Sequence, residues 1–342
     1  MAGKGAHGTA ARLMNDAVDL RAAAAPAAEC DWPITNCYID AWMLILSSWG
    51  LDPLAGLGVT VAQDYEGDQF TFFKYLPEDL ETLYGVAIGE LSIWHSLDVQ
   101  LAAQVGMGRL VLVEVDAYYL PDTRATSYRT QHTKTTIAID SMDLAAGRLT
   151  YFHNVGHYQL SGDDYAGVFR RLPGQDAVDG VLPPYVEFVR HRWPPLRGTA
   201  LTAAAVRLLR RHLWRRPRQN PIRCYRADFP QQMDWLMAHP DRFHDYAFGV
   251  FRQLGANFQM LAAHVNWLDR RGIAGLADAR TAAEAISASA KALQFKVARI
   301  ASRRRFDPCD ASFDALEANY ETAMACLDRA MDLDHAMDQD GC

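Results

Sequence analysis

The sequence predicts an α+β protein in which an antiparallel sheet with helices is followed by a mostly α-helical part. Runs rich in β-branched and aromatic residues are confined to about 29–172, where they alternate with helical segments. A stretch rich in Pro and Gly follows, and beyond it apolar residues recur at helical spacing. We therefore expect a flexible leader at 1–28, a sheet-containing domain at 29–172, a joint at 173–198 and an α-helical domain at 199–335.

The first helix is expected to begin near Cys37. Thr35 and Asn36 are residue types that cap helix N-termini, residues 38–49 are largely apolar, and Gly50 follows them. The next elements expected along the chain are a strand at 69–76, a helix from Pro77, a short strand at 84–88 and a helix at 96–105.

Three stronger strand signals follow. Residues 109–115 (RLVLVEV) form an apolar run, and 133–139 (TKTTIAI) is rich in β-branched residues. Residues 149–154 (LTYFHN) come after a turn at 145–147, so the last two runs predict an antiparallel hairpin. Ser161 is the expected N-cap of the next helix, since Asp residues follow it in the first turn.

The back half has no repeat of fixed period and predicts a helical bundle or cap. Its expected helices are 199–214, 231–237, 243–270, 277–302 and 311–331, separated by loops that carry Pro or Gly.

Composition and charge exclude several classes of protein. Half of the 342 residues are hydrophobic and none of the apolar runs reaches the length of a membrane span, so no membrane association is expected. Residues 1–172 carry 11 Lys/Arg against 21 Asp/Glu, whereas 173–342 carry 23 against 20, and an acidic front half argues against nucleic acid as a partner. Six sparse cysteines without a C-x-x-C pair, and a leader without an apolar core, indicate a reduced cytoplasmic protein.

Three residues in chain order suggest a nucleophilic site. At the start of a helix, the dipole and free N–H groups favour a thiolate at Cys37. His132 precedes one predicted strand and Asn154 ends the next, so the order Cys, His, Asn is the general plan of a papain-type nucleophile. The alternative is that Cys37 is a small buried residue and His132 a polar side chain at a strand end.

Other clusters give weaker signals. His153 and His157 are four residues apart, but on a strand and turn rather than a helix face, so no metal site is expected. Asp116 and Tyr118 follow a predicted strand and are candidates to line a cleft, or to form a packed turn.

A basic cluster lies at 207–218 (RLLRRHLWRRPR). It is interpreted either as a solvated helix face or as a docking patch for an acidic partner. The candidate docking residues are Arg207, Arg210, Arg211, Arg215, Arg216 and Arg218.

The motifs carry a resemblance to a known group of enzymes. Residues 31–46 (DWPITNCYIDAWMLIL) resemble the nucleophile segment of papain-like cysteine enzymes of the bacteriocin-leader peptidase type. With VEVDAYYLPDT, YRTQHTKTTIAID and LTYFHN in 113–154, they look still more like the N-terminal domain of the acyltransferase of butirosin biosynthesis. The whole chain also resembles an uncharacterised bacterial family of about this length whose members accompany amino acid:carrier-protein ligases.

The resemblance implies that 29–172 is a papain-like catalytic domain with Cys37, His132 and Asn154 as its triad. Asp31 stands where papain-type enzymes often carry an oxyanion-hole Gln, and an ionised Asp there would repel an oxyanion. The candidates for the oxyanion hole or cleft are therefore Asp31, Asn36, Asp116 and Tyr118, together with backbone N–H groups at Cys37. His153 is a competing assignment for the third position.

The implied reaction is acyl transfer. Cys37 would take an acyl, expected to be aminoacyl, group from the phosphopantetheine thioester of a carrier protein, and an amine would then accept it. No cofactor is expected to be bound by the chain itself, since phosphopantetheine arrives on the partner. The open alternatives are an amidase or peptidase with the same triad, and a non-catalytic module that binds carrier proteins.

Overall fold

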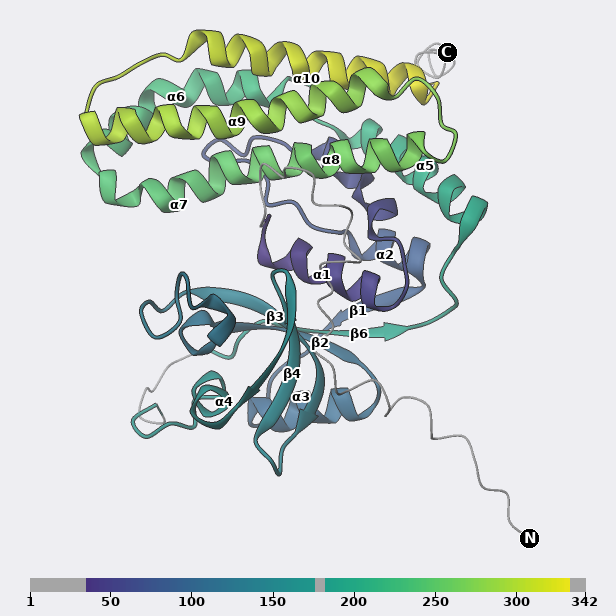
Figure 1. The fold of residues 1–342 in the computed structure, drawn as a ribbon, viewed down its shortest axis with the longest axis vertical. Coiled ribbons are helices and arrows are strands. Elements are labelled where there is room, and N and C mark those ends of the chain that lie inside the picture. The colour runs from purple at the N-terminus through teal and green to yellow at the C-terminus, as the bar shows by residue number, and fades with distance from the viewer. Residues whose placement is uncertain (1–34, 176–181, 333–342) are drawn as a thin grey trace.

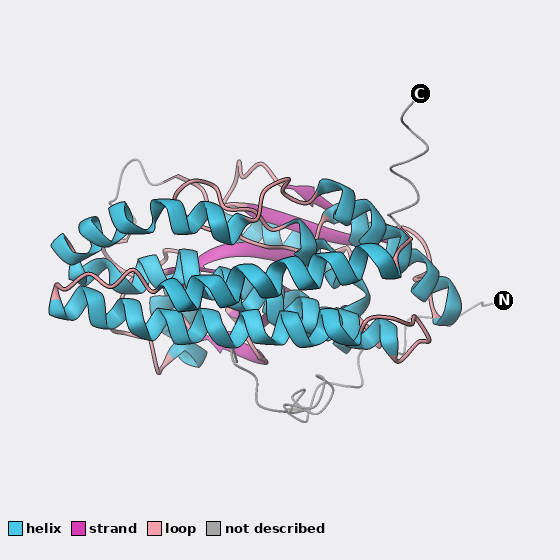
Figure 2. Cartoon of the chain, turned by 90° about the horizontal axis from the view of Figure 1, so that it is seen from above, coloured by secondary structure: helices cyan, strands magenta, loops and turns pink. Residues whose placement is uncertain are grey.

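The computed structural model of this protein describes residues 35–175 and 182–332. A twisted sheet lies at one end of the molecule, a bundle of long helices lies at the other, and α1 and α2 lie between them (Figure 1). Viewed from the bundle end, the long helices lie side by side in front of the strands (Figure 2). The predicted leader at 1–28 and the candidate residue Asp31 lie outside the described residues.

The sheet has six strands in the order β1-β6-β2-β3-β4-β5, and every neighbouring pair is antiparallel. This confirms the predicted α+β class, and the hairpin of β3 and β4 is the one the sequence indicated. The strands are β1 (Val86–Glu90), β2 (Leu110–Asp116), β3 (Lys134–Asp143), β4 (Arg148–His153), β5 (Gly156–Ser161) and β6 (Val186–His191).

Helices precede, cover and follow the sheet. Those of the front half are α1 (Cys37–Ser48), the 3-10 segment η2 (Pro53–Ala62), α2 (Pro77–Tyr84), α3 (Leu97–Gly106), the short turns η3 (Ala117–Tyr119) and η4 (Pro121–Thr123), and α4 (Gly162–Val168). Those of the back half are α5 (Gly198–Arg215), α6 (Pro221–Ala238), η5 (Pro240–Arg242), α7 (Phe243–Ala247), the π-helix η6 (Phe248–Arg252), α8 (Gln253–Asp269), α9 (Ala277–Arg303) and α10 (Asp310–Ala330).

The two faces of the sheet belong to different cores because strand side chains alternate between faces. Leu112, Ala138 and Phe152 point to the face covered by α1 and join a core that continues through the helical bundle. Val113 and Tyr151 point to the opposite face and pack in a second, smaller core with residues of α3 and α4. The front and back halves of the sequence therefore share their main core, so the helical half is packed into the fold rather than appended to it.

The structure differs from the predicted elements in several places. The strand β5 was not expected, and the helix expected at 231–237 begins ten residues earlier as α6. Residues 69–76 form a loop instead of a strand, since the amide of Phe70 donates to the carbonyl of Gly249 in the helical half (3.2 Å). The predicted joint at 173–198 contains β6, which pairs with β1 on one side and β2 on the other. The single helix expected at 243–270 is divided into α7, η6 and α8.

Within 35–175 and 182–332, no helix combines the length and the apolar character that crossing a membrane requires.

Candidate functional site

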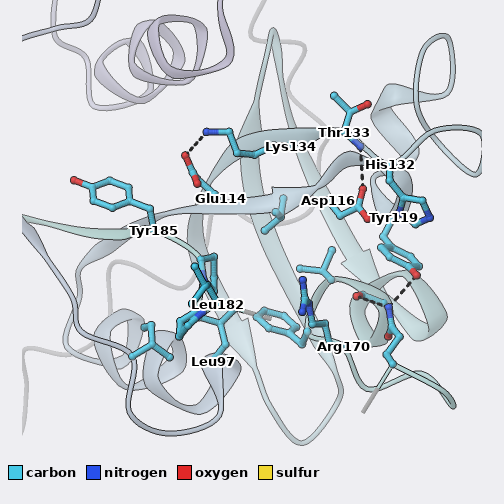
Figure 3. A pocket seen from close by; sticks show the side chains of 18 residues that line it. Leu97, Glu114, Asp116, Tyr119, His132, Thr133, Lys134, Arg170, Leu182 and Tyr185 are labelled. Carbon is cyan, nitrogen blue, oxygen red and sulfur yellow. Dashed lines mark hydrogen bonds and ion pairs between the residues drawn. The ribbon is translucent and has the colours of Figure 1, made fainter. Parts of the chain in front are cut away.

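A cleft of about 790 Å³ opens at the end of the sheet where β2 ends and where β3 and β6 begin (Figure 3). Apolar side chains from α3, α4 and the segment before β6 form one wall, and polar and charged side chains from β2 and β3 form the other. The ionisable residues that line it are Glu114, Asp116, Tyr119, His132, Lys134, Arg170 and Tyr185.

The imidazole of His132 is held in one orientation at this cleft. Its Nδ1 lies 2.5 Å from Oδ2 of Asp116, and its ring stacks on Tyr118 with centroids 4.4 Å apart and planes 12° from parallel. Oδ1 of the same carboxylate accepts hydrogen bonds from the amides of Tyr118 (3.0 Å) and Thr133 (3.3 Å). With Nδ1 engaged and 69% of the side chain exposed, Nε2 is the nitrogen left to exchange a proton with a bound molecule.

The strand register explains why these residues meet. Asp116 is the last residue of β2 and pairs with Lys134, the first residue of β3, so His132 just before β3 comes to lie beside the Asp116 carboxylate. Asp116 also caps η3, and this turn brings the ring of Tyr118 back over His132. His132 and Asp116 are 16 positions apart in the sequence, and the pairing of β2 with β3 brings their side chains together at the end of the sheet.

A second polar chain links the cleft to the start of α1. Tyr185, which lines the cleft, donates to Oε1 of Glu187 (2.9 Å), and Tyr38 donates to Oε2 of the same carboxylate (3.2 Å). Burial, together with the hydrogen bond to Glu187, raises the pKa of Tyr185 to about 12, so its hydroxyl stays protonated. The first turn of α1 is thus anchored to the cleft wall.

Cys37 is the first residue of α1 and carries a half-buried free thiol. The side chain of Asn36 caps the helix by accepting from the amide of Ile39 (2.9 Å), and its own amide donates to the carbonyl of Phe73 (3.1 Å). The prediction of a helix beginning at Cys37 is therefore confirmed. Cys37 is not among the described residues that line the cleft, and no hydrogen bond joins it to His132 within the described ranges.

Asn154 lies beside a different histidine. Its Nδ2 is 3.3 Å from Nδ1 of His153, which in turn lies 2.5 Å from Oδ2 of Asp122, while Nε2 of His153 is 2.8 Å from Oγ1 of Thr135. His153 is almost fully buried on the sheet face opposite α1, because its neighbour Phe152 points to α1. The side chain that orients His132 is accordingly Asp116, which the sequence suggested only as a cleft residue.

Asp40 is buried one turn after Cys37. Its carboxylate accepts from the amide of Thr35 (3.0 Å) and from the Thr35 hydroxyl (2.5 Å). Burial raises the pKa of Asp40 to about 7, although the hydrogen bonds from Thr35 act in the opposite direction.

The Asp40→Asn variant is expected to change how stability depends on pH. Because the pKa of Asp40 is about 7 when folded and near 3.8 otherwise, the folded state binds the proton more tightly, and stability falls as pH rises between these values. The free energy of unfolding of wild type relative to D40N should therefore decrease by about 1.4 kcal/mol from pH 6 to pH 8. Urea denaturation at both pH values measures this, and a difference independent of pH would contradict it.

Much of the basic cluster at 207–218 is used within the protein. Arg211 forms an ion pair with buried Asp79, and Arg216 makes a bidentate pair with Asp328 (2.5 and 2.7 Å). The remaining ion pairs are longer and exposed, and they join Arg215 to Glu78 (3.7 Å) and Arg210 to Asp332 (3.8 Å). Arg207 and Arg218 are exposed and form no ion pair with any residue in the described ranges.

No group of three or more His, Cys, Asp or Glu side chains among the residues that the structure describes is placed to hold a metal ion.

The fold and the cleft define an α+β protein whose antiparallel sheet carries a His–Asp pair at one end and packs against a helix that starts at a cysteine. The chain belongs to the DUF1839 family: the DUF1839 N-terminal domain matches residues 21–191 and the DUF1839 C-terminal domain matches 198–329. The boundary between the two matches falls between β6 and α5. No curated protein matches the chain.

Proposed function

We propose that this protein is a cysteine-dependent acyltransferase of papain-like type. It would move an acyl group, most simply an aminoacyl group, from the phosphopantetheine thioester of a carrier protein to an amine acceptor. The observation that carries the proposal is the His132–Asp116 pair, which leaves Nε2 free at the sheet end to which the first turn of α1 is anchored. The expected resemblance of residues 31–46 and 113–154 to the butirosin acyltransferase domain implies the same chemistry.

Each step of the proposed reaction uses a residue of this chain. Nε2 of His132 takes the proton of the Cys37 thiol, and the thiolate attacks the thioester carbonyl. The pantetheine sulfur leaves and takes a proton, and an acyl-Cys37 thioester remains. An amine then attacks this thioester, His132 accepts the amine proton, and the Cys37 thiol is restored as the amide leaves. The proposal requires Sγ and Nε2 to come within hydrogen-bonding distance in the substrate complex.

The neighbouring groups have supporting roles in this proposal. Asp116 holds the Nδ1–H tautomer of His132 and stabilises the imidazolium that forms when Nε2 is protonated. Asn36 positions the start of the helix, since both ends of its amide are engaged by backbone groups. The oxyanion would therefore be bound by backbone N–H groups of the first turn of α1.

A hydrolase with the same residues is the second candidate. The exposure of 69% at His132 gives water direct access to Nε2, and water would then replace the amine as acceptor. The two reactions share the acyl-Cys37 intermediate and differ only in what attacks it.

Trapping the intermediate tests the shared step. Wild type is mixed with an acyl-loaded carrier protein and with short acyl thioesters, and intact mass is followed. We expect one acyl group per chain in wild type and in Cys224→Ala, and none in Cys37→Ala. Cys224 is a fair control because it is also a half-buried free thiol and lies far along the chain on α6. Acylation of Cys37→Ala at the wild-type rate, or no acylation of wild type, would refute the proposal.

A further inference from the structure

Two cationic and three aromatic side chains form a continuous strip that begins at the first turn of α1. Lys74 Nζ lies 4.8 Å from the centroid of the Tyr38 ring and 5.8 Å from that of Phe72. The Phe72 ring lies 6.2 Å from the Phe248 ring, and the Arg252 guanidinium lies 5.6 Å from the Phe248 ring. We call these five residues the cation–aromatic strip.

The strip is assembled from segments that are far apart in the sequence. They are the first turn of α1, the loop at 69–76 and the π-helix η6, and the hydrogen bonds of this loop to Asn36 and Gly249 fix it between the other two. Phe72 and Phe248 are 37% and 39% exposed, so a bound molecule could contact both rings. A π-helix places an extra residue in a helical turn and is frequently found at functional sites.

The two cations of the strip have no salt bridge with any residue in the described ranges. Burial lowers the pKa of Arg252, and Asp40 is the carboxylate among the described residues that opposes this effect. The oxygens of Asp40 already accept both hydrogen bonds from Thr35. A partly buried guanidinium without a dedicated counter-ion is energetically unfavourable, and an anionic ligand would remove that cost.

We propose that the cation–aromatic strip binds the phosphopantetheine arm, with Arg252, at the end of the strip away from Cys37, as the cationic ligand of its phosphate and Lys74 beside the end that carries the thioester. This assignment rests on the proposed function. The arm has a phosphate at one end and the thioester at the other, and the strip offers cations together with exposed rings next to Tyr38, the neighbour of Cys37. The phosphate takes charge-assisted hydrogen bonds, while the amide-containing arm lies across the Phe72 and Phe248 rings. The same phosphate occurs on carrier proteins and on coenzyme A.

Calorimetric titration of the full chain with 4′-phosphopantetheine and with pantetheine, which lacks only the phosphate, tests the assignment. Wild type is expected to bind the phosphorylated arm at least tenfold more tightly, and the double variant Lys74→Ala, Arg252→Ala is expected to lose that preference. Arg252→Lys should retain part of it. Arg190→Ala is the control, since Arg190 also lies over a phenylalanine ring (5.7 Å) but is exposed and belongs to β6. The arm is also titrated on a serine peptide, as carrier proteins carry it, and as coenzyme A. The tighter of the two ligands identifies whether the subsite serves carrier proteins or coenzyme A.

Equal affinity for the two arms in wild type, or an undiminished preference in the double variant, would overturn the assignment. Thermal unfolding of the double variant checks that its fold is intact. The R252K variant repeats the binding measurement with the positive charge kept. Binding is measured without turnover, so its outcome is independent of acylation. If the protein prefers the phosphorylated arm but Cys37 is never acylated, the phosphate subsite stands and the proposed function fails. If Cys37 is acylated but the protein shows no preference for the phosphate, the proposed function stands and the subsite fails.

Discussion

Replacing His132 by Ala is expected to lower the rate of Cys37 acylation by about 10²–10⁴-fold, the usual contribution of a positioned general base. The physical reason is that Nε2 is the nitrogen free to take the thiol proton, because Asp116 occupies Nδ1. Asp116→Asn should give a loss of similar size, because the carbonyl oxygen of Asn would accept from the amides of Tyr118 and Thr133 and its NH2 group would donate to Nδ1. The proton of the neutral ring would then lie on Nε2, which could no longer take the thiol proton. Single-turnover acylation followed by intact mass measures both rates.

The chain offers a matched control for this experiment. His157 also forms a His–Asp pair, with its Nε2 3.0 Å from Asp140, and it also stacks on an aromatic ring, that of Phe152 (4.3 Å). It lies on β5, outside the cleft lining. His157→Ala should therefore acylate Cys37 at the wild-type rate. Equal losses in H132A and H157A would show that the effect comes from general destabilisation of the sheet, and an unchanged rate in H132A would exclude His132 as the base.

Asp79→Ala is expected to destabilise the protein by about 3 kcal/mol, near the lower end of the range for breaking a buried ion pair. Asp79 on α2 is almost fully buried, and its carboxylate accepts from Nε2 of buried His212 (2.6 Å) and from Arg211, both on α5. Removing the carboxylate leaves these donors without a partner between α2 and α5. The loss should be near the lower end because the side chain of Arg211 is 37% exposed and water can solvate it in part.

Urea denaturation measures this loss against a neighbouring control. Glu78 precedes Asp79 on the same helix and pairs with Arg215 at 3.7 Å, but both side chains are about half exposed. Glu78→Ala should therefore change the free energy of unfolding by no more than about 1 kcal/mol. Similar losses in D79A and E78A would contradict the structural role of the buried pair. Confirmation would mean that Arg211 acts within the protein and that an acidic partner could use only the exposed arginines of the cluster.

Local sequence signals predicted the elements that carry the candidate chemistry. The start of α1 at Cys37 follows from the cap at Asn36, because a capping side chain bonds to amides only three residues away. The β-branched run before β4 likewise predicted β3 and its hairpin partner. The helical half was recognised from its spacing, although the π-helix η6 was not, since one additional residue in a helix leaves little trace in an apolar pattern.

The hydrogen-bond partner of His132 could not be predicted from the sequence. Asn154 was expected to orient it because it ends the following strand, but its side chain contacts its own neighbour His153. Strand register instead places Asp116 next to His132. Register depends on which residues pair across strands, and a single sequence does not show this pairing. The six residues of β6 lie between prolines and were expected in a joint, but they form an interior strand because β1 and β2 pair with them.

The sequence alone determined the α+β class, the helix that begins with a cysteine and the helical character of the back half, because caps, turns and apolar periodicity act over a few residues. The tertiary structure decided the His132–Asp116 pair, the burial of Asp79 against α5, and the strip that joins α1 to η6. These contacts bring together residues that are between 16 and more than 100 positions apart. Such contacts form only when strand pairing and the shared core have fixed the elements in space.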